Sequence, residues 1–310
     1  MLNYVIAIAV SASIYALMAL GMNVIWGLAG MINLGLVGFF AVGAYVSALS
    51  SLKFGIAIAP AMAAGAVSAA LVGVVVSLVT ARLRGDYLAI VTLGFSETIR
   101  IIASNEIWLT NGTDGLPRIP GPYRGQMPPE AFNLVYLAIA AIVVLIAFVL
   151  AERVAHSPFG RVLRAIRDDE QAVAVAGKHV VLFKVKAFAI SAGMLGLAGA
   201  LYGHYASYIA PDIFVPLLTL YITLALLAGG LGSNRGAVLG AFVVVFFLEV
   251  TRFITPLVPG LGHVQGAALR EFLISVALIV ILRYRPRGLI AERLPYVEIP
   301  SAGTQPAGHR

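Results

Sequence analysis

The sequence predicts an all-α, polytopic transmembrane helical bundle of about nine spans, on three observations. First, 60% of its 310 residues are hydrophobic and only 11% are charged, whereas soluble globular domains carry roughly 45–50% apolar and about 25% charged residues. Second, the apolar residues gather in runs of about 20 residues, the length that a spanning helix needs. Third, Lys and Arg concentrate between alternate runs, as they do on the cytoplasmic side of membrane proteins.

Nine apolar runs are candidate spans. They lie near residues 3–26, 29–51, 56–81, 86–104, 133–152, 186–206, 214–232, 236–256 and 268–284. No Lys or Arg precedes the first run, which favours a span over a cleaved signal peptide. The runs predict one transmembrane domain, residues 1–294, followed by a polar and flexible cytoplasmic tail, residues 295–310.

The distribution of basic residues predicts the orientation. Nine spans put the two termini on opposite sides, and 15 of the 21 Lys and Arg residues then lie on the side of the C-terminus. The other side holds only Lys53, Arg118 and Arg124. The predicted topology is therefore N-out and C-in. It places the Gly- and Pro-rich connection 105–132 in the periplasm as an ordered loop, and the charged connection 153–185 in the cytoplasm.

Composition also excludes several function classes. The net charge of +7 is explained by the inner connections, so it does not indicate nucleic acid as a partner. The chain has no cysteine, which removes disulfides, Cys-bound zinc and thiol nucleophiles. The histidines do not recur at metal-ligand spacing, so we expect no metal and no other cofactor. No Ser/His, His/Glu or paired-Asp pattern supports an intramembrane enzyme.

The inner connection 153–185 predicts a short amphipathic helix. Ser157, followed by Pro, is a typical helix start, and Leu163 and Ile166 recur at helical spacing. Gly177 can end the helix in the left-handed conformation. The pattern leaves two interpretations open. The helix lies on lipid headgroups, or it docks an exposed apolar contact into a soluble partner and transmits the partner's movement.

The same connection resembles the coupling segment of branched-chain amino acid ABC transporter permeases, in residues 160–170 (GRVLRAIRDDE) and on to Gly177. Further stretches are similar to the same family, in the same order, along nearly the whole chain. They are ALGMN (19–23) through GAY (43–45), LRGDYLAIVTL (83–93), LAGALY (197–202), GGLGS (229–233) and RPRGL (285–289). The particular likeness is to the second permease of the pair that handles leucine, isoleucine and valine.

The resemblance implies a heteromeric importer in the bacterial cytoplasmic (inner) membrane. Its other parts are a second homologous permease, two ATP-binding subunits and a periplasmic solute-binding protein. The implied solute is a branched-chain amino acid or a related small polar molecule. The implied ATPase-coupling residues are Leu163, Arg164, Ile166, Arg167, Glu170 and Gly177. The chain departs from the family pattern at Lys178-His179 and Asn234-Arg235, which bear on the solute and on the fit to an ATPase.

The residues themselves agree with a separate energy source. The chain has no G-x-x-x-x-G-K-[ST] phosphate loop. At the nearest candidate, Gly177-Lys178, Ala172 stands at the first Gly position and His179 at the Ser/Thr position. Energy must come from another chain or from an ion gradient. A stand-alone secondary transporter or channel is therefore the alternative function.

Four residues are candidates for lining the solute path: Asn23, Asn33, Thr92 and Glu97. The two asparagines lie in a Gly-rich stretch, and broken helices at membrane depth are tolerated where they line a cavity. Plain tight packing is the alternative for this stretch. Glu97 and Arg100 have the i,i+3 spacing of an ion pair. With Glu249, Arg252, Arg270 and Glu271 they indicate either a polar outer vestibule or structural pairs near the membrane surface.

Small residues and aromatic residues carry two further expectations. Gly199 with Gly203, and Gly232 with Gly236 and Gly240, predict close helix packing within the chain. Aromatic residues are common at membrane surfaces. We therefore expect an interfacial belt of Tyr202, His204, Tyr205 and Tyr208.

Overall fold

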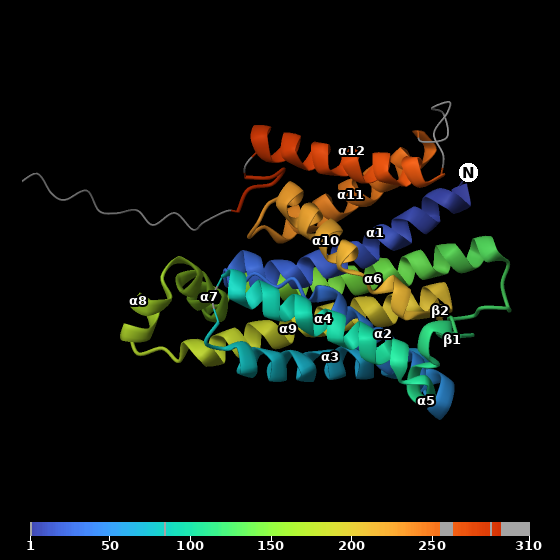
Figure 1. Cartoon of the computed structure of the whole chain (residues 1–310), viewed down its shortest axis with the longest axis horizontal. Helices are drawn as coiled ribbons and strands as arrows, with labels where there is room; N and C mark the ends of the chain where they lie inside the picture. The colour runs from blue at the N-terminus through green and yellow to red at the C-terminus, as the bar shows by residue number, and fades with distance from the viewer. Residues whose placement is uncertain (1, 84, 255–262, 286, 293–310) are drawn as a thin grey trace, which may run out of the picture.

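The structure is a computed structural model that describes residues 2–83, 85–254, 263–285 and 287–292. It is an all-α bundle with one small two-stranded sheet (Figure 1). The helices are α1 (Leu2–Met22), a π-helix (Asn23–Leu28), α2 (Leu36–Phe54), α3 (Ile58–Thr80), α4 (Asp86–Asn105), α5 (Ile107–Thr110), α6 (Pro129–His156), α7 (Pro158–Asp168), α8 (Glu170–Val175), α9 (Val180–Ala206), α10 (Pro216–Gly229), α11 (Asn234–Ile254) and α12 (His263–Tyr284).

Within the described residues, eight helical segments are long and apolar enough to cross a membrane. They are α1 with the π-helix, α2, α3, α4, α6, α9, α10 with the turn before it, and α11. These match the first eight predicted runs and make the chain a multi-pass membrane protein. The ninth, α12, has 22 residues, but its described apolar stretch is shorter, Glu271–Ile281.

The two ends of the bundle differ (Figure 1). The N-terminus and the β1–β2 sheet lie at one end, and α7 and α8 project from the other. The connections 105–132 and 153–185 therefore lie at opposite ends, as the predicted topology requires. Which end faces the cytoplasm stays a prediction.

Two predicted boundaries are wrong in an informative way. The second span begins at Leu36 rather than at residue 29, because the first span continues as a π-helix to Leu28. The charged connection is also shorter than predicted. Helix α6 continues to His156 and α9 already begins at Val180, so Lys184 and Lys186 lie in the first two turns of a spanning helix.

The break between the first two spans, residues 29–35, is the irregular backbone that the Gly-rich stretch predicts. Two hydrogen bonds close the π-helix, from the Gly30 amide to the Trp26 carbonyl (2.9 Å) and from the Met31 amide to the Ile25 carbonyl (3.1 Å). At Gly30 the backbone enters the left-handed region, with φ +70°. At Gly35 a Cβ atom would lie 2.2 Å from the Thr92 carbonyl oxygen. The break thus packs directly against α4.

Glycines bring helices into backbone contact within this chain, as predicted. A Cβ atom at Gly199 on α9 would lie 1.9 Å from the Phe40 carbonyl oxygen of α2. One at Gly240 on α11 would lie 1.9 Å from the Ala225 carbonyl oxygen of α10. Small residues allow such approach where lipid provides little drive for helices to associate. Gly203 contributes less, because a Cβ there would meet only ordinary van der Waals contacts.

The connection 105–132 is ordered, with β1 (Leu116–Pro117) paired antiparallel to β2 (Tyr208–Ile209) after α9. His204 lies under this pairing with no exposed surface. Its Nδ1 is 2.7 Å from the Pro120 carbonyl oxygen and its Nε2 is 2.9 Å from the Ser47 hydroxyl. Because a carbonyl only accepts, Nδ1 carries the proton and the Ser47 hydroxyl donates to Nε2. The predicted aromatic belt is therefore wrong for His204, which joins the connection 105–132 to α2.

Candidate functional site

The segment of α7 and α8 is built by three local signals in its sequence. The Ser157 hydroxyl accepts a hydrogen bond from the Gly160 amide (3.2 Å) and Pro158 starts α7, as predicted. The Asp169 carboxylate caps α8 by accepting from the amides of Gln171 (2.8 Å) and Ala172 (3.0 Å). Gly177 follows α8 with φ +77°, as predicted. The segment is nevertheless two helices, because the backbone at Asp169 is extended.

The expectation that Leu163 and Ile166 form an exposed apolar contact is wrong. Their exposed fractions are 0% and 5%. Leu163 belongs to the main core of the bundle, and Ile166 packs with Val173 and Val180 in a small core under the segment. The apolar side chain that the segment does present outward is Val175, which is 90% exposed. The apolar face of α7, which the helical spacing of Leu163 and Ile166 predicts, therefore packs against the bundle of the same chain.

Arg167 joins this segment to the broken first span. Its Nη1 donates to the Gly27 carbonyl oxygen in the π-helix (2.5 Å) and to the Glu292 carboxylate (3.0 Å). Its side chain also lies against the backbone after the π-helix, because a Cβ atom at Gly30 would be 2.8 Å from Arg167 Cγ. Arg167 therefore connects α7 to the end of the first span through a charge-assisted hydrogen bond and direct packing.

Glu170 and Lys184 fix the other side of the segment. The Lys184 ammonium donates to the Glu170 carboxylate at 2.8 Å, between the start of α8 and the first turns of α9. The Lys184 residue is only 5% exposed. A buried amine needs such a partner, since leaving it unpaired is costly. Glu170 is thus engaged within the chain, and this bond holds α8 to the bundle.

Asn23 ties the π-helix to the turn between α10 and α11. Its amide nitrogen donates to Asn234 Oδ1 (2.8 Å), and its Oδ1 accepts from the Gly232 amide (2.9 Å). Asn23 has no exposed surface and Asn234 is buried, whereas Gly232 is half-buried. Asn23 is therefore a structural bridge at the same end of the bundle as Arg167. The departure from the family pattern at Asn234 has a physical role here.

The segment 287–292 closes this end of the bundle. The amides of Leu289 and Ile290 donate to the carbonyls of Ala228 and Gly229, both at 2.8 Å, and so satisfy the last turn of α10. Glu292 then reaches Arg167. Four segments far apart in sequence meet here: the π-helix, α7, the α10–α11 turn and the chain after α12. We call this the coupling-end junction, defined by Asn23, Gly27, Arg167, Asn234 and Glu292.

Asn33 and Thr92 meet at the break between the first two spans. Asn33 Oδ1 accepts from the Gly35 amide (2.8 Å), and the Thr92 hydroxyl accepts from the Leu34 amide (3.1 Å) while donating to the Ala89 carbonyl (3.0 Å). Both side chains are buried. Asn33 Nδ2 has no hydrogen-bond partner within the described part of the chain. The two residues hold the irregular backbone, and one amide group is left for another contact.

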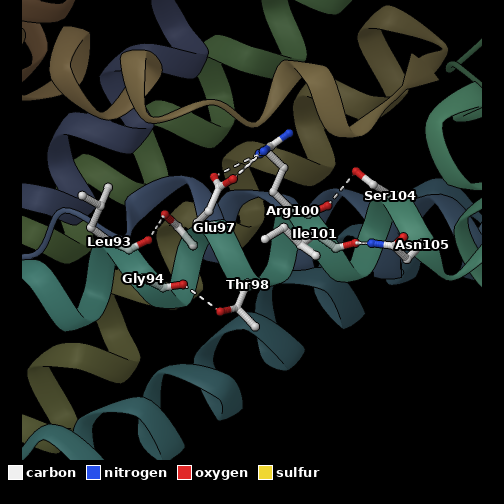
Figure 2. Close-up of polar contacts among 9 residues, drawn as sticks. Leu93, Gly94, Glu97, Thr98, Arg100, Ile101, Ser104 and Asn105 are labelled. Atoms are coloured by element: carbon white, nitrogen blue, oxygen red, sulfur yellow. Dashed lines mark hydrogen bonds and ion pairs between the residues drawn. The ribbon is translucent and has the colours of Figure 1, made fainter.

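Glu97 lies apart from these residues, paired with Arg100 on α4 (Figure 2). Arg100 Nε is 3.1 and 3.0 Å from the two Glu97 carboxylate oxygens, as the i,i+3 spacing predicts. The side chain of Glu97 is 36% exposed and that of Arg100 is 29% exposed. The neighbouring hydroxyl of Thr98 and amide of Asn105 bond to carbonyls of the same helix. The ion pair is thus a charged feature at the surface of α4, about three turns from the exposed Asp86 at the start of the helix.

The other predicted intramembrane charges are only partly placed. Glu249 accepts a hydrogen bond from the Tyr4 hydroxyl, which ties α11 to α1. The side chains of Arg252 and Arg270 lie outside the described residues. A vestibule made of all six charges stays a prediction.

A cavity of about 260 Å³ lies between α1, α2, α9 and α10. Its walls are aliphatic and aromatic, with Ile14 and Met18 from α1, Phe40 from α2 and Leu218 from α10. Three tyrosines also line it: Tyr15, Tyr202 and Tyr221. Predominantly apolar walls with a few polar groups are typical of small-molecule sites. Sequence patterns did not single out this cavity, because its walls come from four separate spans.

Comparison with known proteins is consistent across nearly the whole chain. Residues 4–282 match the sequence model of a family described as the branched-chain amino acid transport system permease component. The chain is 31% identical to the branched-chain amino acid permease LivM of Salmonella typhimurium, over 95% of this chain and 72% of that protein. It is 29% identical to a probable LivM of Methanocaldococcus jannaschii, over 90% and 91%.

A more distant likeness extends to the companion permease. LivH of Escherichia coli is 26% identical over 74% of this chain and 79% of that protein. No solved structure matches the chain significantly.

Proposed function

The chain belongs to the family of branched-chain amino acid transport permeases and is a permease subunit of an ABC importer, and from this premise we propose its solute, partners and mechanism. The solute is a branched-chain amino acid or a related small polar molecule. A second homologous permease completes the path in the bacterial inner membrane. Two ATP-binding subunits drive it, and a periplasmic binding protein delivers the solute. The chain itself is a transport subunit rather than an enzyme.

The bond between Arg167 and the Gly27 carbonyl carries the mechanistic part of this proposal. The segment of α7 and α8 projects from the bundle (Figure 1), and Val175 is its exposed apolar tip. ATPase subunits docked there would move the segment. Arg167 would pass that movement to the break at 29–35, where Asn33 and Thr92 hold irregular backbone. Alternating access then follows from a shift of the first span relative to α4.

The apolar cavity supports the solute class. Its walls suit an aliphatic side chain, because burial of apolar surface is favourable and is not directional. Tyr15, Tyr202 and Tyr221 also line the cavity and bring polar groups close to its apolar walls. Glu97 and Arg100 together carry no net charge, which suits the passage of a zwitterion near α4.

Docking through Val175 is tested by Val175→Asp in the chain assembled with its two ATPases. We predict loss of ATPase co-purification and of ATP-driven leucine uptake, because a charge replaces the apolar contact. Phe54→Asp is the matched control. Phe54 is 77% exposed at the end of α2, and this change should leave both readouts near wild type. Undiminished ATPase binding by the Val175 variant would contradict the docking role.

The alternative, a transporter that works alone, is tested with the same material. The purified chain in liposomes should not accumulate leucine under an ion gradient without the ATPases and ATP. Uphill accumulation by the isolated chain would favour the stand-alone alternative.

A further inference from the structure

A second cavity, of about 530 Å³, opens at the same end of the bundle as α7. It is lined by the end of α6, by α7, by the start of α11 and by residues 290–292. Three arginines line it: Arg161 and Arg164 from α7 and Arg235 from α11. They come from two helices that are far apart in the sequence, so the fold rather than a local run of charge brings them together.

The arginines of this cavity are available to a ligand. Within the residues that the structure describes, none of the three has a carboxylate at ion-pair distance. The two carboxylates that also line the cavity each contact a basic side chain other than these three arginines, and one of these partners, His156, itself lines the cavity. Glu152 lies 3.2 Å from the His156 ring, and Glu292 lies 3.0 Å from Arg167. Glu292 Oε1 has no hydrogen-bond partner among the described residues, so an anion would sit toward the arginines and away from Glu292.

Apolar surface continues from the cavity along both flanking helices. On α11, Arg235 is followed on the same helical face by Leu239, Phe242 and Phe246, which are 41%, 40% and 63% exposed. On α6, Glu152 shares a face with Leu145 and Val149, also exposed. Residues three and four apart lie on one face of a helix. Both helices pack on α1, so the two stripes flank the same helix.

We propose that this cavity binds the phosphate-bearing headgroup of an anionic phospholipid, whose acyl chains lie along the α6 and α11 stripes. Arginine is suited to phosphate because its planar guanidinium donates two parallel hydrogen bonds. Basic cavities at the ends of membrane helices are typical sites for acidic headgroups. Exposed apolar side chains next to the cavity explain why a lipid, rather than a soluble anion, is the occupant. The lipid would brace α7 against α11 beside the coupling-end junction.

Thermal unfolding of the purified full chain in detergent tests the headgroup preference. Added phosphatidylglycerol should raise the melting temperature by about twofold more than phosphatidylcholine does. The double variant Arg161→Gln/Arg235→Gln should lose most of that difference. Arg153 is an exposed arginine on α6 outside the cavity, and the control variant Arg153→Gln should keep the difference between the two lipids.

Equal shifts from the two lipids, or a double variant that responds like wild type, would overturn the proposal. So would inorganic phosphate that reproduces the full phosphatidylglycerol shift, since the site would then hold a soluble anion.

A second measurement does not depend on the folding of the arginine variants. The chain has no cysteine, so Leu239→Cys provides a single site for a fluorescent label. Brominated phosphatidylglycerol should quench this label more strongly than brominated phosphatidylcholine, in the isolated chain and in the assembled importer. Quenching that is equal for the two lipids would refute the proposal. Quenching that disappears on assembly would also refute it, since a neighbouring permease would then cover the surface.

Discussion

Asn23 shows how one buried side chain can hold two separate spans together. Its amide group makes both of its strong hydrogen bonds across the chain, to Asn234 and to the Gly232 amide. The sequence indicated a place on the solute path because Asn23 lies in a Gly-rich stretch, which predicts a broken helix that lines a cavity. In the structure its side chain instead bonds to the turn between α10 and α11. The functional consequence is a rigid link between the π-helix and α11.

The change Asn23→Ala should destabilise the chain by about 1–3 kcal/mol for each group left unpaired. The Gly232 amide and Asn234 Oδ1 would both lose their partner inside the protein. Thermal unfolding of the detergent-purified chain measures the effect. Asn105→Ala is the control, because Asn105 is exposed at the end of α4 and bonds only to its own helix. A melting temperature equal to that of the control would contradict the bridging role.

The ion pair of Glu97 and Arg100 allows a prediction about the cost of an unpaired charge in a spanning helix. Glu97→Gln should reduce the yield of inserted, folded protein, because Arg100 would remain as an unpaired charge. An unpaired charge costs about 2.5–3.5 kcal/mol at the bilayer centre and less near the membrane surface. The double variant Glu97→Gln/Arg100→Gln should recover the yield. If the recovered double variant still transports poorly, the pair also serves the path. A single variant as stable as wild type would remove the structural role.

At the scale of elements, glycine contacts decide which helices can pair. Gly240 on α11 and Gly94 on α4 are both helical glycines in spans, but their surroundings are opposite. A Cβ atom at Gly240 would lie 1.9 Å from a backbone oxygen, whereas one at Gly94 would meet nothing within 4 Å. Backbone atoms cannot move aside as a flexible side chain can. The α10–α11 contact therefore depends on Gly240.

The matched pair Gly240→Ala and Gly94→Ala separates packing from helix propensity. Alanine favours a helix over glycine by about 1 kcal/mol, so Gly94→Ala should be neutral or stabilising. Gly240→Ala should lower the melting temperature clearly, since α10 and α11 would be forced apart. Equal effects of the two changes would mean that α10 and α11 do not pack as described.

The amphipathic segment shows what sequence reasoning could and could not predict for an element. Its caps were predictable, because Ser157 before Pro and Gly177 act through local backbone geometry. The direction of its apolar face was not. Leu163 and Ile166 have the spacing of a buried face, but spacing alone does not say whether the burial is against the same chain or a partner. Asp169 divides the segment into two helices, because its backbone is extended and its carboxylate caps the second helix. An aspartate in the sequence does not by itself indicate that its backbone is extended.

At the scale of the whole molecule, eight of the nine predicted spans and their order could be predicted from apolar length, since eight predicted runs match long apolar helices of the structure. The coupling-end junction could not be predicted, because its members come from residues near 23, 167, 234 and 292. No local pattern links positions that far apart. The same limit applies to the apolar cavity and the arginine-lined cavity, both of which are assembled from several helices.

The coupling-end junction connects the projecting segment α7–α8 to other parts of the bundle. Segment α7–α8 projects at one end, and its bonds to the π-helix and to residues 287–292 connect it to the first and last parts of the bundle. The connection 105–132, at the opposite end of the bundle, is fixed separately through β1–β2 and His204. Movement imposed on α7 would therefore reach the break at 29–35 while that opposite end keeps its own contacts.

A reversible cross-link between Gly30 and Arg167 tests that claim most directly. A Cβ atom at Gly30 would lie 3.2 Å from Arg167 Cβ, close to the roughly 3.5–4.5 Å that a disulfide requires, and the chain has no other cysteine. ATP-driven leucine uptake is measured for Gly30→Cys/Arg167→Cys in the assembled importer, reduced and oxidised. Each single variant is the control. We predict low uptake when reduced, because the arginine bond is gone, and recovery on oxidation, because the disulfide replaces it. Uptake that is normal when reduced, or that stays low when oxidised, would contradict the claim that α7 and the broken span move as one unit.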